Sequence, residues 1–277
     1  MRGIGAIPEL QEAIPTEIQP FFMIGTYLGY FAFFFGAVSL YYLYQPKRRK
    51  GIFVLTAVIA AMAVGVFLKN VFGLPRPPSG LQQTSASGFA FPSNHALIST
   101  TLFFGLAAAS DLWTRRTRYG LVSLIVAFIA ISRIAVGAHF LVDIVAGIGV
   151  GLLIVYLTRR YLESTETTGG ALGITAIDLG VFPDISGDKV GIVLGTSLYL
   201  FVIHRFISIG AEKLGSMKKL SPRSINFILG IPVIFVAVYI HESFYGKQTV
   251  SFVTIFLGVL AILYIPSISQ IVYRKIR

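Results

Sequence analysis

The chain has 277 residues, of which 55% are hydrophobic and only 13% charged, and its long apolar runs are typical of polytopic membrane proteins. Cysteine is absent, which excludes a disulfide framework, a thiolate nucleophile and a cysteine-based metal site. A net charge of +11 would suggest nucleic-acid binding in a soluble protein. Here the basic residues cluster in short loops beside apolar runs, as topology signals do, so we expect membrane lipids and no nucleic acid as partners.

The amino-terminal residues 1–20 contain prolines and three glutamates, Glu9, Glu12 and Glu17. They lack the charged head, the short apolar stretch and the small-residue cleavage site of a secretory signal. We expect them to form a short interfacial segment.

Residues 21–160 are predicted to form a core of five membrane-spanning helices. Each needs an apolar stretch that can cross about 30 Å of hydrocarbon. Such stretches run roughly over residues 21–44, 52–72, 92–110, 119–136 and 139–157.

Basic clusters set the predicted orientation of this core. They follow the first, third and fifth of these stretches, at residues 47–50, 115–118 and 159–160. By the positive-inside rule these loops are cytoplasmic, so the N-terminus and the loops at 73–91 and 137–138 are expected outside.

Residues 161–277 are predicted to form a carboxy-terminal extension of three or four helices, with apolar stretches near 190–209, 225–240 and 250–268. With eight crossings the basic loop near residues 213–223 and the basic tail would both be external, against the positive-inside rule. A ninth crossing at 169–182 would repair this, although that stretch is short and contains Asp178. The predicted fold class is therefore all-α, a polytopic transmembrane helical bundle of eight or nine crossings with its N-terminus outside, nine being favoured.

Three polar segments fall on the predicted outer side of the core: KNVFGLPRPP from Lys69, FPSNHA from Phe91, and SRIAVGAHFLVD from Ser132. Ionisable groups near hydrocarbon are costly unless they are paired or face water, so they indicate a functional site. A lone basic residue at a helix end could merely snorkel to the interface. The convergence of three cations and two histidines on one interface is more than packing requires.

The cations Lys69, Arg76 and Arg133 would repel one another unless a multiply charged anion lay among them, and arginine suits phosphate oxygens in particular. The segment FPSNHA adds a helix N-terminus, where unpaired backbone N–H groups favour anions and Ser93 could donate a further hydrogen bond. Together these features predict a phosphate site. Taken alone, FPSNHA would be an ordinary helix start.

His139 and Asp143 are four residues apart and share a helix face. A carboxylate that accepts from one ring nitrogen fixes the tautomer and leaves the other nitrogen free to attack, so His139 could take a phosphoryl group covalently. His95 could protonate the leaving oxygen and then activate water. The same two histidines and aspartate could instead bind zinc, but three neighbouring cations argue against a metal and for a site without a cofactor.

The motifs Lys69-x6-Arg76-Pro77, Pro92-Ser93-Asn94-His95 and Ser132-Arg133-x5-His139-x3-Asp143 resemble, in order and spacing, the three signature motifs of the type 2 phosphatidic acid phosphatase family. That family includes lipid phosphatases, polyprenyl diphosphate phosphatases and glucose-6-phosphatase, and it shares its site with vanadium haloperoxidases. The resemblance covers roughly residues 50–157.

The resemblance implies that His139 is the nucleophile, Asp143 its orienting partner and His95 the acid and base, with no metal needed. It also implies that the phosphate is held by Lys69, Arg76, Ser93, Asn94 and Arg133. One position departs from the family pattern, because Asn94 stands where glycine is usual. Asparagine keeps the backbone N–H and tolerates unusual backbone angles, so we expect activity to survive with an altered pocket.

From these features we expect a multi-pass cell-membrane phosphatase of lipid phosphates or diphosphates, with its site on the external face and a polyprenyl diphosphate favoured as substrate. Phosphatidate, phosphatidylglycerol phosphate and a soluble sugar phosphate are the alternatives. A transporter would use charges near the midplane and matching halves, neither of which the sequence has. A haloperoxidase would share the anion site, but the known relatives of that kind are soluble. The sequence does not indicate an oligomeric state.

Overall fold

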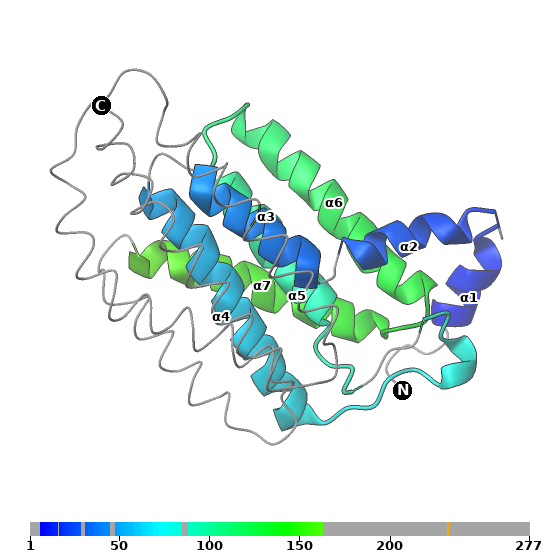
Figure 1. Ribbon diagram of the computed structural model, residues 1–277. Helices are drawn as coiled ribbons and strands as arrows, with labels where there is room; N and C mark the ends of the chain where they lie inside the picture. Colours follow the sequence, from blue (N-terminus) through cyan, green and yellow to red (C-terminus); the bar gives the residue numbers. More distant parts are fainter. Residues whose placement is uncertain are drawn as a thin grey trace, which may run out of the picture. The chain divides into compact units, whose positions relative to one another are not determined.

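A computed structural model of the chain describes residues 6–15, 17–28, 31–44, 48–84 and 88–162, together with the single residue 232. The regular secondary structure of the described residues is helical, with no β-strand among them (Figure 1). The helices are α1 (Ala6–Ala13), α2 (Gln19–Tyr27), α3 (Phe31–Tyr44), α4 (Arg48–Phe72), the 3-10 turn η1 (Ser79–Leu81), α5 (Asn94–Ala109), α6 (Arg115–Ala135) and α7 (Leu141–Leu162). The predicted carboxy-terminal helices and the ninth crossing lie outside the described residues.

Three described helices are long and apolar enough to cross a membrane: Phe53–Phe72 within α4, Arg115–Ala135 and Leu141–Arg160. α5 is apolar but shorter. The stretch predicted as one first crossing, 21–44, holds two helices, α2 and α3, and Pro20 lies in the first turn of α2. Apolar composition predicts that a segment is buried in lipid or protein, but it does not reveal a break between two apolar helices.

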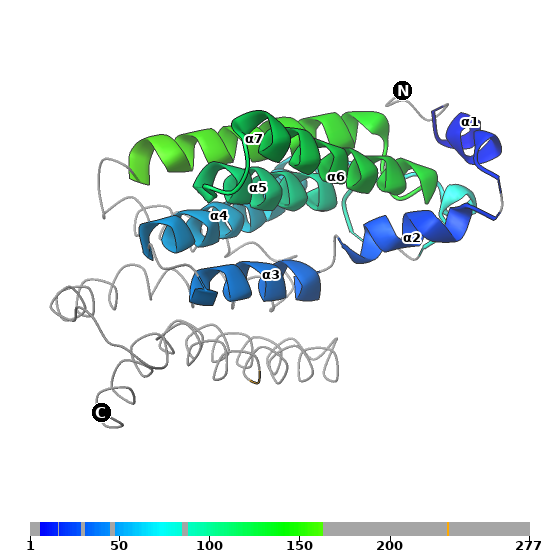
Figure 2. The ribbon, with the colours of Figure 1, turned by 90° about the horizontal axis from the view of Figure 1, so that it is seen from above.

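One compact unit comprises the described residues within 1–35 and 64–159 and contains every motif residue. A second unit takes residues 36–63 and the residues after 159. Within the first unit, α6 packs against α5, α2 and α1 (Figures 1 and 2). The amino-terminal helices α1 and α2 therefore belong to the same packed body as the motif-bearing helices.

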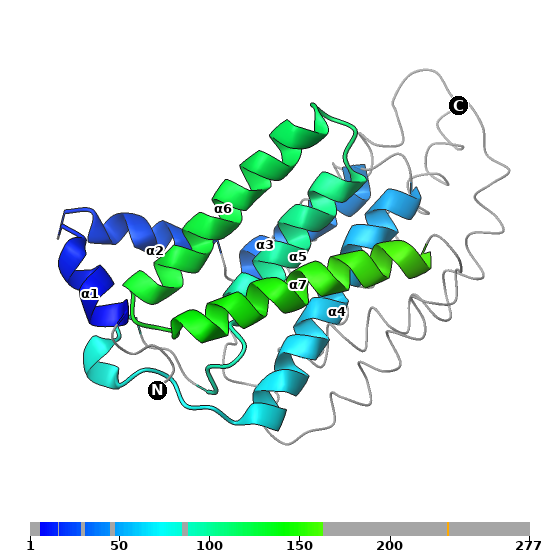
Figure 3. The ribbon, with the colours of Figure 1, turned by 180° about the vertical axis from the view of Figure 1, so that it is seen from behind.

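Two glycines bring α5 and α7 into very close contact. A Cβ at Gly147 would lie 2.7 Å from the carbonyl oxygen of Ser93, and one at Gly151 would lie 2.8 Å from that of Leu97. Real Cβ atoms do not approach so closely, so only glycine fits. The four-residue spacing repeats the small-residue pattern by which membrane helices approach each other. Figure 3 shows α7 crossing α5.

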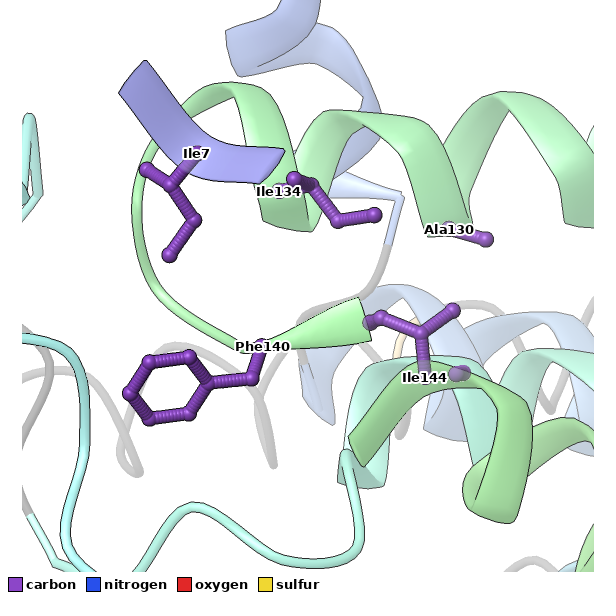
Figure 4. Packing of buried hydrophobic residues seen from close by; sticks show 6 residues of the cluster. Ile7, Ala130, Ile134, Phe140 and Ile144 are labelled. Atoms are coloured by element: carbon purple, nitrogen blue, oxygen red, sulfur yellow. The ribbon is translucent and has the colours of Figure 1, made fainter. Parts of the chain in front are cut away.

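A buried apolar cluster lies beside the loop between α6 and α7 (Figure 4). It contains Ile7, Ala96, Ala130, Ile134, Phe140 and Ile144. Ile7 is fully buried, and burying a side chain of that size stabilises a fold by about 1.5–3 kcal/mol. The residues predicted as an interfacial segment thus also contribute to the core.

Helix ends near the motifs follow from local sequence. α4 ends at Phe72 and is followed by Gly73, whose φ of +56° suits glycine and whose N–H donates to the Lys69 carbonyl over 2.9 Å. α5 begins after Ser93, whose hydroxyl oxygen accepts from the N–H of Ala96. α6 is followed by Gly137, with φ of +68°. Each of these ends turns the chain beside a motif residue.

Candidate active site

Lys69 lies in the last turn of α4 and is tied to the segment before α5. Its Nζ donates to the carbonyl oxygens of Phe89 and Ala90, the latter over 3.2 Å. The N–H of Ala90 in turn donates to the Leu74 carbonyl over 2.8 Å. These bonds hold the end of α4 against the segment that leads into FPSNHA.

Arg76 connects that segment to the loop between α6 and α7. Its Nε donates to the Gly88 carbonyl over 3.1 Å, and its Nη1 donates to the Ala138 carbonyl over 2.9 Å. The same Nη1 lies 3.1 Å from Nε2 of His139. Because a guanidinium can only donate, His139 Nε2 must be the acceptor in this contact. Arg76 therefore holds a positive charge directly in front of that nitrogen.

His139 is 1% exposed and lies in the loop between the candidate spans of α6 and α7. Its other ring nitrogen, Nδ1, is 3.4 Å from Oδ2 of Asp143, which is longer than an ordinary hydrogen bond. With Nε2 accepting from Arg76, the proton of a neutral ring is on Nδ1, facing the carboxylate. In this tautomer the free lone pair of the ring is on Nε2, on the side of Arg76.

Burial lowers the pKa of His139 well below the ordinary value of 6.5. The charges of Arg76, Lys69 and Arg133 lower it further, while a backbone hydrogen bond involving Ala90 acts in the opposite direction. The ring is therefore neutral at neutral pH. Burial also lowers the pKa of Arg76, and the negative charge of Asp143 partly offsets this.

Asp143 is fully buried in the first turn of α7 and fixes two backbone segments. Its Oδ2 accepts from the N–H of Phe140 over 3.0 Å, which caps the helix start in the manner of a capping box. Its carbonyl accepts from the N–H of Ser93 over 3.0 Å. The start of α7 and the start of α5 are thereby joined beside the histidine.

The motif PSNH lies at the N-terminus of α5. Ser93 is fully buried as the N-cap, and Asn94 and His95 are the first residues of the helix. His95 lies within electrostatic range of His139 and of Lys69, Arg76 and Arg133. The two histidines and three cations predicted from the sequence therefore come together around one helix N-terminus, where anions bind favourably.

Asn94 packs against α4. A Cβ at Gly65 would lie 2.5 Å from the Asn94 Oδ1, which is buried without a hydrogen-bond partner. Gly65 therefore provides the room that the asparagine side chain occupies. The residue is accommodated by a glycine in the facing helix, one turn of α4 before Lys69.

Arg133 is 3% exposed at the end of α6. Its Nη1 donates to the Thr26 hydroxyl oxygen over 2.7 Å. Its backbone carbonyl accepts from the N–H groups of Ala138 and His139 over 3.0 and 3.3 Å. One residue thus supplies a buried cation and also anchors the loop that carries His139.

Several residues that shape this region stand outside the motifs. Thr26 contacts Arg133, and Gln11 of α1 donates through Nε2 to the carbonyls of Leu81 and Ala135, both over 2.9 Å. A Cβ at Gly137 would lie 1.9 Å from the Leu81 carbonyl oxygen, so η1 rests directly on this glycine. Position in sequence offers no signal for Thr26 or Gln11, because both precede the first motif by many residues.

Among the described residues, no group of three or more histidine, aspartate or glutamate side chains is arranged to hold a metal ion. The site instead combines two histidines with one aspartate and three cations. Such an arrangement can bind a multiply charged anion against a neutral, oriented imidazole.

Comparison with known proteins agrees with this arrangement. A model of the PAP2 superfamily matches residues 50–165. The chain is 28% identical over 132 residues to an undecaprenyl-diphosphatase of Sulfolobus acidocaldarius, covering 46% of this chain and 62% of the relative. It is 28% identical over 162 residues to a probable lipid phosphate phosphatase beta of Arabidopsis thaliana, covering 48% of this chain and 76% of the relative.

A third relative is sphingosine-1-phosphate phosphatase 2 of Homo sapiens, 24% identical over 165 residues, which are 53% of this chain and 41% of that protein. The similarity thus spans about half of the chain and between two fifths and three quarters of each relative. No solved structure matches. Residues 50–165, which carry all three motifs, therefore match the PAP2 superfamily, in agreement with the resemblance of these motifs to the type 2 phosphatidic acid phosphatase family.

Proposed function

We propose that the protein is an integral-membrane phosphatase that hydrolyses lipid phosphates or diphosphates through a phosphohistidine at His139. One observation carries the proposal: the buried Nε2 of His139 faces the Arg76 guanidinium at 3.1 Å, while Nδ1 faces Asp143. A nucleophilic lone pair is thus aimed at a position where a cation would hold a phosphoryl group. The geometry suits attack on phosphorus.

The first chemical step forms a bond between His139 Nε2 and phosphorus and breaks the bond from phosphorus to the leaving oxygen. His95, protonated when the anionic substrate is bound, gives one proton to that oxygen and becomes neutral, so the lipid leaves as an alcohol or a monophosphate. The phosphorylated imidazole carries positive charge, which Asp143 stabilises through Nδ1–H.

In the second step water attacks phosphorus and gives a proton to His95. The bond between phosphorus and Nε2 breaks, its electron pair returns to the ring, and inorganic phosphate leaves. Both transition states concentrate negative charge on the phosphoryl oxygens. Lys69, Arg76, Arg133, the Ser93 hydroxyl and the backbone N–H groups at Asn94 would stabilise that charge without a metal.

The membrane arrangement that we propose follows from which helix ends carry the site. Lys69 lies in the last turn of α4 and Arg133 in the last turn of α6, whereas the basic clusters at 115–118 and 159–160 lie at the first turn of α6 and near the end of α7. If those clusters are cytoplasmic, the site lies at the external face and the N-terminus is outside. We further propose eight or nine crossings in all, and domains of residues 1–20, 21–160 and 161–277.

Lipid is the substrate class that this arrangement favours. Side chains of α7 such as Val145, Leu153 and Tyr156 are largely exposed, which is what lipid contact requires. The relatives are named for undecaprenyl diphosphate, lipid phosphate and sphingosine 1-phosphate. We favour a polyprenyl diphosphate, since an external site suits carrier recycling. Phosphatidate, phosphatidylglycerol phosphate and sugar phosphates are the competing substrates.

The test is phosphate release by the full chain in detergent with excess EDTA. The panel holds a polyprenyl diphosphate, phosphatidate, phosphatidylglycerol phosphate and glucose 6-phosphate. His139→Ala should abolish both phosphate release and the trapping of a phosphoenzyme. His204 lies outside the three motifs, so His204→Ala should keep both. Phosphate release unaffected by His139→Ala would refute the nucleophile. Strong EDTA inhibition reversed by zinc would instead support a metal, and binding of phosphate without any hydrolysis would support an anion transporter.

A further inference from the structure

The N-terminal helix α2 makes three contacts along α6 that end at the candidate site. Phe21 and Phe22 place their rings 4.9 and 6.2 Å from the ring of Phe128. One helical turn further, Gly25 faces Ser132, and a Cβ there would lie 2.6 Å from the serine oxygen. The two helices can approach this closely only because residue 25 is glycine.

This close approach brings Thr26 onto Arg133. The threonine is 1% exposed, and its hydroxyl oxygen accepts from Arg133 Nη1 over 2.7 Å. A short hydrogen bond to a charged donor in a buried setting is among the stronger ones in proteins. This hydrogen bond restricts the orientation of the Arg133 guanidinium, because the arginine side chain could otherwise adopt several rotamers.

The backbone of Arg133 is fixed as well. Its carbonyl accepts from the N–H groups of Ala138 and His139, so its backbone is fixed to the His139 loop. The guanidinium also acts electrostatically on both His95 and His139. The orientation of this one side chain therefore determines where a cation stands relative to the two histidines.

We propose that Thr26 is a positioning residue that holds the Arg133 guanidinium for phosphate binding, so that α2 completes the anion site. The proposal rests on the proposed function. It assigns a role to a residue that precedes the family-matching segment, residues 50–165, and carries no motif. Thr26 acts through Arg133 and need not touch the substrate.

Thr26→Val removes the hydroxyl while keeping the branched shape, and Thr26→Ser keeps the hydroxyl. Thr100→Val is the matched control, because Thr100 is fully buried in α5 and its hydroxyl has no hydrogen-bond partner. In the full chain we measure kcat and KM and the inhibition constant of inorganic phosphate. Unfolding temperature is followed in the same detergent.

We expect Thr26→Val to raise the phosphate inhibition constant and lower kcat/KM by about tenfold, as loss of a charged hydrogen bond implies. Thr26→Ser and Thr100→Val should stay within about twofold of wild type. In an Arg133→Ala background the effect of Thr26→Val should vanish, because no guanidinium remains to be positioned. A merely structural role would lower the unfolding temperature but leave the inhibition constant unchanged.

Equal inhibition constants and kcat/KM for Thr26→Val and Thr100→Val would overturn the proposal. So would an undiminished effect of Thr26→Val in the Arg133→Ala background. If the wild-type protein releases no phosphate, the proposed function fails by itself. Phosphate binding, measured as protection against thermal unfolding, then tests the role of Thr26 separately, with the same variants and the same expected ranking.

Discussion

Gly147 and Gly149 allow the contact between α5 and α7 to be measured with an internal control. Both glycines lie inside α7, two residues apart. Replacing either by alanine gains helix propensity worth up to about 1 kcal/mol. At Gly149 the new methyl group meets nothing within 4 Å, whereas at Gly147 it would lie 2.7 Å from the Ser93 carbonyl oxygen and 3.1 Å from the Ala96 Cβ.

The size of the effect follows from these distances. A contact of 2.7 Å must open to at least 3.4 Å to become ordinary, and the atom in the way belongs to backbone that cannot rotate aside. Overpacking of this kind typically costs about 1–3 kcal/mol. Because the propensity gain is common to both variants, it cancels in the comparison. Gly147→Ala should therefore be less stable than Gly149→Ala by about 1–3 kcal/mol.

Activity should separate the two variants further. Ser93 donates its N–H to the Asp143 carbonyl, so pushing α5 away from α7 disturbs the start of both helices beside His139. We expect Gly147→Ala to lose most of the proposed phosphatase activity and Gly149→Ala to keep it. Unfolding in detergent and phosphate release are measured on the same preparations. Equal stability and equal activity of the two variants would refute the close contact between α5 and α7.

Three further outcomes are expected from the same structure. Gly137→Ala should destabilise the fold by about 2 kcal/mol or more, because it adds left-handed backbone strain and places a methyl group against the Leu81 carbonyl. Gly120→Ala is the control, because its methyl group would enter open space. A lower unfolding temperature for Gly120→Ala than for Gly137→Ala would contradict this reasoning. Thr114→Ala should lower the free energy of unfolding by about 1 kcal/mol, because the α6 N-cap is lost. Thr114→Ser should keep most of the wild-type stability, and a serine variant as unstable as the alanine variant would argue against capping. As pH falls below 6.5, the free energy of unfolding should decline, because the unfolded chain takes up a proton at His139 before the native state does. His139→Asn should weaken this pH dependence. An unchanged pH dependence of unfolding in that variant would count against the lowered pKa of His139.

Much of the site could be predicted because charged residues in an apolar chain are conspicuous. Lys69, Arg133 and His139 stand out against their neighbours, and their positions near the ends of the apolar stretches follow from the length of each stretch. The local sequence predicts a helix start within FPSNHA, although α5 begins at Asn94 and not at Pro92. The spacing of His139 and Asp143 predicts a shared helix face; His139 instead precedes α7, with its Nδ1 3.4 Å from Oδ2 of Asp143.

Other features could not be predicted, because they depend on contacts between distant segments. Thr26 resembles any other threonine until the fold brings it to Arg133, 107 residues along the chain. Gly65 and Asn94 fit each other only across α4 and α5. The division of 21–44 into α2 and α3 is likewise invisible in hydropathy, since both helices are apolar.

The burial of Ile7 bears on how much of the chain must fold together with the site. The family match starts at residue 50, yet Ile7 packs with Ile134 and Phe140 in the apolar cluster, and Gln11 bridges Leu81 to Ala135. A protein trimmed to residues 50–165 would open a cavity beside His139 and release η1. The part of the chain that packs around the site is therefore longer than the part that matches the family, residues 50–165. Expression boundaries chosen from that match alone would cut through the core.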